Sequence, residues 1–192
     1  MSAIQGRVVI ISGPSGAGKS TLVQEVLRIC PLPLALSISA TTRAPRPDEV
    51  DGTAYHFLTP EEFERRRKAG HFLEYEEVFG QGLWYGTLEQ SITDSLEAGQ
   101  WVILEIDVAG AMTVIDRIPD AITIFIHPGS MQELENRLRN RKTDSEEAIT
   151  KRLEVAHHEM ANRDKYQHQV INDDVKRAAN EVSTILQAAE NI

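Results

Sequence analysis

The stretch Gly13-Pro14-Ser15-Gly16-Ala17-Gly18-Lys19-Ser20 has the pattern G-x-x-x-x-G-K-S and directly follows the apolar run VVII at 8–11. Glycines lack a Cβ, so consecutive backbone N–H groups in such a segment can turn inward and surround phosphate oxygens. Lys19 adds a mobile positive charge, and the hydroxyl of Ser20 is a ligand type that suits Mg²⁺. A glycine-rich turn that binds nothing is the alternative, but the strand context favours a phosphate-binding loop (P-loop). The segment therefore predicts a nucleoside triphosphate site.

The residues after this loop predict a helix. Leu22, Val23, Val26 and Leu27 recur at the spacing of one helix face. The N-terminus of that helix points toward the bound anion, with a dipole of favourable sign.

Composition sets limits on the class of protein. A chain of 192 residues can bury a substantial core and is expected to form one α/β domain with small insertions. Its net charge of −9 argues against broad nucleic-acid binding, so anionic substrates need local basic clusters. The single Cys30 excludes an internal disulfide and suits a reducing compartment. With neither a targeting nor a membrane-spanning pattern, the sequence predicts a cytoplasmic protein without membrane contact.

Apolar runs alternate with helical patterns along the chain. We expect strands at 7–12, 34–39, 101–106, 121–127 and 169–172, separated by helices, which favours a mostly parallel sheet flanked by helices. Ser or Thr followed three residues later by Glu or Gln predicts N-caps at Thr59, Thr87 and Ser130. Longer helices are expected over about 145–162 and 175–189.

Two regions exceed what a minimal core needs, about 37–95 and 130–160, and both resemble insertions that close over ligands. The first holds Arg43 and Arg46 in a loop with Pro45 and Pro47, with no acid between the two cations. Because guanidinium binds phosphate bidentately, ligand binding is favoured for this loop over solvated surface charge. For Arg137, Arg141 and Arg152 in the second region, ligand binding and solvated surface charge both stay open.

Acidic residues follow the strand expected at 101–106. Glu105 and Asp107 come at its carboxyl end, the edge where ligands of open α/β sheets bind. A carboxylate there can hold Mg²⁺ through water, although a turn-forming role is the alternative for Asp107. The adjacent His157 and His158 point to different helix faces and lack the spacing of a metal pair.

Taken together, the ordered motifs resemble guanylate kinase. They are GPSGAGKST (13–21), SISATTRAPRPDEVDGTAYHF (37–57), FLEYEEVF (72–79), WYGT (84–87), ILEIDVAGA (103–111), RLRNRKTDSEEAITKRL (137–153) and VINDD (170–174). The resemblance covers nearly the whole chain. It departs from the family pattern in a longer turn at 79–84 and in Lys142, where the lid often has glycine.

The resemblance implies an ATP:GMP phosphotransferase of purine nucleotide metabolism that uses Mg²⁺, accepts GMP and dGMP, and recycles GMP. It implies a P-loop core (1–36, 96–129 and 161–192), a GMP-binding region (37–95) and a helical lid (130–160). It further implies three sets of site residues: for ATP, Gly13, Pro14, Ser15, Gly16, Ala17, Gly18, Lys19, Ser20, Thr21 and Asn172; for GMP, Ser39, Arg43, Arg46, Tyr55, Glu74, Tyr85, Thr87 and Asp107; and for the transferring phosphoryl group, Lys19, Arg43, Arg137, Arg141 and Arg152. Ser20 and Glu105, the latter through water, match the metal site.

Two other functions stay open. A kinase for another phosphorylated small molecule, such as a ribose bisphosphate, would share the fold, but a sugar offers no base edge for Glu74 and Ser39. A non-catalytic scaffold domain that binds phosphopeptides would not need Lys19 and Ser20. Monomer and homo-oligomer both remain possible.

Overall fold

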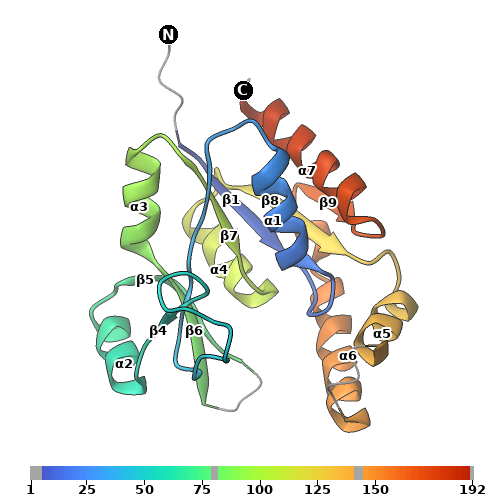
Figure 1. Ribbon diagram of the computed structural model, residues 1–192, viewed down its shortest axis with the longest axis horizontal. Coiled ribbons are helices and arrows are strands. Elements are labelled where there is room, and N and C mark those ends of the chain that lie inside the picture. The colour runs from blue at the N-terminus through green and yellow to red at the C-terminus, as the bar shows by residue number, and fades with distance from the viewer. Residues whose placement is uncertain (1–5, 79–81, 141–144, 191–192) are drawn as a thin grey trace.

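A computed structural model describes residues 6–78, 82–140 and 145–190. Its centre is a parallel sheet of five strands in the order β2-β7-β1-β8-β9 (Figure 1). The strands are β1 (Val8–Ser12), β2 (Leu34–Leu36), β7 (Trp101–Glu105), β8 (Ile122–His127) and β9 (His168–Ile171). This confirms the predicted mostly parallel sheet, with a shorter strand than expected at 34–36 and a strand at 168–171 that begins one residue earlier than expected.

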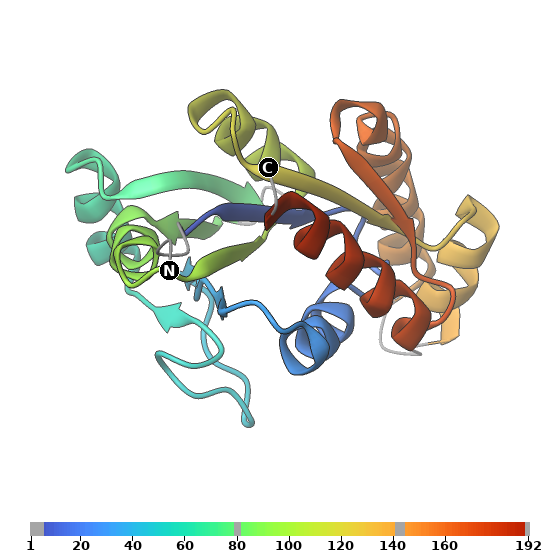
Figure 2. The same ribbon diagram turned by 90° about the horizontal axis from the view of Figure 1, so that it is seen from above.

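Helices cover both faces of this sheet, which explains why β1 carries apolar side chains on both of its faces. Figure 2 shows α1 (Lys19–Ile29) and α7 (Val175–Glu190) together on one face, with α4 (Val108–Arg117) on the other. Val9 and Ile11 belong to the core under α1 and α7, whereas Val8 and Ile10 belong to the core under α4 and α3 (Glu89–Glu97). Parallel strands buried on both faces are typically continuous apolar runs, as VVII is.

A second sheet of four strands lies within residues 40–88 and was not predicted. Its order is β4-β3-β6-β5, formed by β3 (Ala40–Thr41), β4 (His56–Phe57), β5 (Phe72–Val78) and β6 (Leu83–Leu88). The helix α2 (Pro60–Lys68) packs on it through Phe63, whose ring stacks on Phe72 with centroids 4.5 Å apart. This region therefore has an aromatic core of its own.

The second arginine-rich region forms a pair of helices, α5 (Met131–Asn140) and α6 (Glu146–Met160). Leu134, Leu138, Ile149 and Ala156 form a small apolar cluster between them. The short helix η1 (Arg163–Lys165) then leads into β9. Arg141 and Lys142 lie outside the described residues, as does part of the longer turn at 79–84.

The predicted caps have mixed outcomes. The hydroxyls of Thr59 and Ser130 accept from the backbone N–H groups of Glu62 and Glu133, as expected. The cap at Thr87 was wrong: α3 begins after Leu88, and the Thr87 hydroxyl is buried and donates to Glu74 instead. A buried carboxylate needs a donor, and the hydroxyl supplies it in preference to the helix end.

Helix α4 was also not predicted from the sequence.

No helix in the described part of the chain is long and apolar enough to cross a bilayer.

Candidate active site

The P-loop joins β1 to α1 with the geometry that its glycines allow. Gly13 has φ 142°, and a Cβ there would lie 2.0 Å from the carbonyl oxygen of Ile126 on β8. Gly18 caps α1 in the left-handed region with φ 84°. Both positions need glycine, because a side chain would clash or be strained. The loop therefore lies tight against the sheet edge, with the N-terminus of α1 facing the adjoining cleft.

The rear of the loop is held by the segment after β9. The buried side chain of Asn172 donates from Nδ2 to the carbonyl oxygen of Ala17 at 2.8 Å. The backbone carbonyl oxygen of Asn172 accepts from the Arg137 guanidinium at 2.8 Å. Arg137 also pairs with Glu133 on α5. Neither Asn172 nor Arg137 lines the cleft. In this structure the two residues support the loop from behind.

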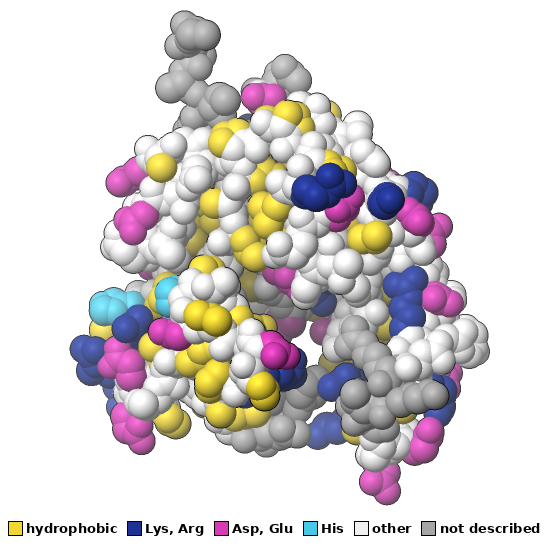
Figure 3. Space-filling model, in the orientation of Figure 1, with side chains coloured by type: hydrophobic (Ala, Val, Ile, Leu, Met, Phe, Trp, Pro, Cys, Tyr) yellow, Lys and Arg dark blue, Asp and Glu magenta, His cyan; other side chains and the backbone are white. Residues whose placement is uncertain are grey.

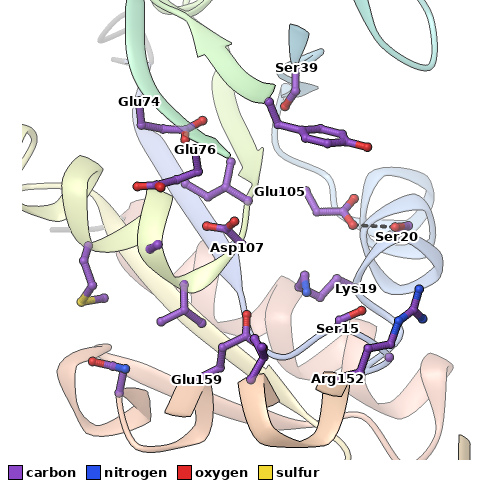
Figure 4. A pocket seen from close by; sticks show the side chains of 18 of the residues that line it. Ser15, Lys19, Ser20, Ser39, Glu74, Glu76, Glu105, Asp107, Arg152 and Glu159 are labelled. Carbon is purple, nitrogen blue, oxygen red and sulfur yellow. Dashed lines mark hydrogen bonds between the residues drawn. The ribbon is translucent and has the colours of Figure 1, made fainter. Parts of the chain in front are cut away.

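A cleft of about 800 Å³ opens in front of the P-loop. In Figure 3 the molecule is hollowed between the lobe of the second sheet and the lobe of α5 and α6. Figure 4 shows Ser39 and Glu74 at one end of the cleft and Ser15, Lys19, Arg152 and Glu159 at the other. Predicted site residues that line it are Ser15, Gly16, Gly18, Lys19, Ser20, Thr21, Ser39, Tyr55, Glu74, Tyr85, Glu105, Asp107 and Arg152. The two insertions and the core thus contribute to one cavity.

Two oxygen groups meet beside the P-loop lysine. The Ser20 hydroxyl donates to Oε1 of Glu105 at 2.5 Å, so the end of β7 and the start of α1 bring together a hydroxyl and a carboxylate. Lys19 donates to the carbonyl oxygens of Gly13 and Pro14 at 2.6 and 3.2 Å. Burial lowers the pKa of Lys19, while Glu159, Glu105 and Asp107 act in the opposite direction. The described residues contain no group of three or more His, Cys, Asp or Glu placed to hold a metal.

Glu74 lies at the far end of the cleft on β5. Its Oε1 accepts from the Thr87 hydroxyl on β6 at 2.5 Å, and the residue is only 6% exposed. Burial raises the pKa of Glu74 to about 7, aided by the nearby charge of Asp107 and opposed by the bond from Thr87. Space for this carboxylate comes from Gly110, where a Cβ would lie 2.6 Å from Oε2. Glu74 is therefore an inward-facing acceptor, not the surface residue that its sequence context alone suggests.

Asp107 is the N-cap of α4, which agrees with the alternative, structural interpretation of this residue. Its side chain accepts from the backbone N–H of Gly110 at 2.8 Å, and it also lines the cleft. Burial raises the pKa of Glu76, aided by the charge of Asp107, and sequence reasoning did not single out this glutamate. Glu74 and Glu76 therefore lie at the end of the cleft away from the P-loop, with Asp107 between them and Lys19 (Figure 4).

Arg43 has an acidic partner that the sequence argument missed, because it lies after the two cations and not between them. Its Nη1 and Nη2 groups donate to Glu49 at 2.9 and 2.8 Å, and Nε donates to the Tyr85 hydroxyl at 3.1 Å. The guanidinium carbon of Arg43 lies 5.5 Å from the centroid of the Tyr55 ring and 5.8 Å from that of the Phe57 ring. Arg46 is exposed, and its backbone N–H donates to Glu49. Tyr55 and Tyr85 line the cleft, whereas the two arginines do not.

The helix α6 supplies one of the predicted cations of the cleft and an acid that was not predicted. Arg152 lines the cleft, as does Glu159 two turns later. Burial raises the pKa of Glu159 to about 7, against the attraction of Lys19. No motif in the sequence distinguished this glutamate from the exposed ones on the same helix. His157 and His158 are exposed, and Cys30 is a buried free thiol.

Comparison with known proteins agrees with this arrangement. A family model described as guanylate kinase matches residues 5–189. Similar curated proteins include a guanylate kinase of Rhodopirellula baltica, 56% identical over 96% of this chain and 89% of that protein, and one of Rubrobacter xylanophilus, 48% identical over 95% and 94%.

Among solved structures, the guanylate kinase of Anaplasma phagocytophilum aligns with a TM-score of 0.76 at 30% identity, covering 97% of this chain and 87% of that one. A shikimate kinase from Bacteroides thetaiotaomicron, with TM-score 0.54 and 16% identity over 97% of this chain and 99% of that one, shares the P-loop fold. The match of the family model along nearly the whole chain, together with these identities, shows that the chain belongs to the guanylate kinase family.

Proposed function

We propose that this protein transfers the γ-phosphoryl group of ATP to GMP, giving ADP and GDP, with dGMP as a further acceptor in purine nucleotide metabolism. The observation that carries the proposal is the single cleft in which a P-loop faces a buried glutamate (Figure 4). Residues 37–95 then form the acceptor region and 130–160 the lid. The donor phosphates lie on the P-loop, and the guanine lies beside Glu74.

Base choice follows from hydrogen-bond chemistry. Guanine presents two donors on one edge, N1–H and the exocyclic amino group, which an ionised Glu74 accepts, whereas adenine has no N1–H. The single proton of the Thr87 hydroxyl is already donated to Glu74 in this structure. Ser39, which lines the same end of the cleft, is then the hydroxyl that donates to guanine O6.

The acceptor phosphate needs positioning more than activation. With a second pKa of about 6, a phosphate monoester is mostly dianionic at neutral pH, so no general base is required. The obstacle is repulsion between two anions, which Lys19 and the arginines offset. Arg43, its ring neighbour Tyr55 and its partner Tyr85 form the acceptor clamp, and Arg43 exchanges Glu49 for the phosphate on binding.

Ser20 and Glu105 fit a magnesium ion, because a hydroxyl and a carboxylate are hard oxygen ligands, and Mg²⁺ at phosphate sites takes few protein ligands. Ser20 would bind it directly and Glu105 through water. Bound there, the ion neutralises phosphate charge. The chain's own residues hold the triphosphate, orient the acceptor and exclude water as the lid closes.

A coupled assay of ADP production tests the proposal. We expect turnover with GMP and dGMP, and far less with AMP or ribose phosphates. Glu74→Gln should lose the preference for GMP over AMP, while Glu76→Gln, a neutralisation two residues along the same strand, should keep it. Phosphopeptide binding without ATP turnover would instead support a scaffold domain, and preferred turnover of a ribose phosphate would support the sugar kinase.

A further inference from the structure

Glu159 is a buried acid that the proposed transfer reaction does not yet use. It lies near the C-terminal end of α6 and lines the P-loop end of the cleft, to the left of Lys19 and Ser15 in Figure 4. Its Oε2 atom is buried and has no hydrogen-bond partner among the described residues. Buried polar oxygens are rarely left unpartnered, so this atom points to an interaction that a ligand completes.

The groups around Glu159 are those of the phosphate-binding loop. The backbone N–H of Ser15 faces the carboxylate and lowers its pKa, as does the charge of Lys19. Asp107, at the start of α4, acts in the opposite direction, because its negative charge raises the pKa of Glu159. The phenol of Tyr166, just before β9, also interacts with Glu159, whose charge is one cause of the raised pKa of Tyr166. Burial is the largest influence and raises the pKa of Glu159 to about 7.

A polyphosphate on the P-loop would bring negative charge to the same Ser15 N–H and Lys19. An ionised carboxylate beside those oxygens would repel them, and a like charge nearby favours the neutral acid. The neutral acid has an O–H group, which can donate to a phosphate oxygen. The unpartnered oxygen thus becomes a donor for which the ligand is the acceptor.

We propose that Glu159 is a nucleotide-contacting residue that takes up one proton from solvent when the phosphate chain enters the P-loop and then donates a hydrogen bond to a phosphate oxygen. The step adds one proton to one carboxylate oxygen and releases no other group. The inference rests on the proposed function only in assuming a triphosphate on the P-loop. It does not depend on which acceptor is used.

Titration calorimetry with a non-hydrolysable ATP analogue and Mg²⁺ tests this. The number of protons taken up is obtained at pH 8 in two buffers of different ionisation enthalpy. With a carboxyl that is mostly ionised before binding and neutral afterwards, the wild type should take up roughly 0.5–0.9 proton more than Glu159→Gln. Glu154→Gln, an exposed neutralisation on the same helix, should match the wild type.

A second control tests whether the proton is taken up by Glu74, whose pKa is also raised to about 7. Glu74→Gln should retain the proton uptake if Glu159 is its source. Equal uptake by the wild type and Glu159→Gln would overturn the proposal, as would loss of the uptake in Glu74→Gln alone. Circular dichroism melting establishes that each variant folds.

If Glu159→Gln does not fold, the wild type alone still decides the matter. Its dissociation constant for the analogue should rise by about fivefold to tenfold between pH 7.5 and 8.5, and a pH-independent constant would refute the inference. Analogue binding without GMP binding would refute the proposed function and leave this inference standing. Failure to bind the analogue would refute both.

Discussion

Replacing Glu74 by Gln should increase stability above neutral pH while removing guanine recognition. The buried carboxyl has a folded-state pKa raised to about 7 from an ordinary value of 4.5, chiefly by burial. The folded protein therefore holds this proton more tightly than the unfolded chain does. Above pH 4.5 this carboxyl ionises in the unfolded chain but not in the folded protein, so the free energy of unfolding falls as the pH rises. The fall is complete once the pH passes the folded-state pKa of about 7.

The size of the effect follows from the shift. A difference of about 2.5 pKa units corresponds to about 3 kcal/mol of lost stability at pH 8, of which about 1 kcal/mol is already lost at pH 5. Gln cannot ionise, and its oxygen can still accept from Thr87. The stability advantage of Glu74→Gln over the wild type should thus grow by roughly 2–3 kcal/mol between pH 5 and pH 8.

Urea unfolding followed by circular dichroism, at pH 5, 6, 7 and 8, measures this difference. The change with pH is informative even if the new amide alters packing, because a packing cost does not vary with pH. Glu76→Gln serves as the control, since Glu76 is less buried than Glu74. A difference between Glu74→Gln and wild type that stays constant from pH 5 to pH 8 would refute the reasoning.

Three other substitutions have defined outcomes. Arg43→Ala should lower kcat/KM for GMP by an amount equivalent to about 3–4 kcal/mol, measured by steady-state kinetics; a value within a fewfold of wild type would exclude Arg43 from the transfer step. Phe63→Ala should cost about 3–5 kcal/mol of unfolding free energy, because the buried ring stacks on Phe72; a loss below 1 kcal/mol in denaturant titration would contradict that packing. Thr59→Ala should cost about 1 kcal/mol through loss of the α2 cap, whereas Thr59→Ser should restore the stability, and equal melting temperatures for both variants would disprove the cap.

The main sheet could be predicted because its strands are continuous apolar runs between recognisable helix signals. The second sheet could not, because β3 and β4 are two residues long and carry no alternation. Helix α4 was missed for a related reason: its N-cap Asp107 comes directly after an apolar strand, and the pattern looked like a strand end. Thr87 shows the same limit, since a buried carboxylate 13 residues earlier competes for its hydroxyl.

For the site, the structure shows only which of the expected residues lie together. Lys19 and Ser20, expected from local patterns, line the same cleft as Ser39, Tyr55 and Glu74, expected from the family resemblance. The pairing of Arg43 with Glu49 and the burial of Glu159 depend on how distant segments pack. Neither leaves a local trace in the sequence.

The central position of β1 has a consequence for biosynthesis. This strand pairs on one edge with β7 and on the other with β8, which are synthesised more than ninety residues later. Until then its apolar side chains have no sheet to join, and such exposed segments invite chaperone binding or aggregation. Translation that stops before residue 101 would release a chain that carries the P-loop sequence but has no platform to shape it.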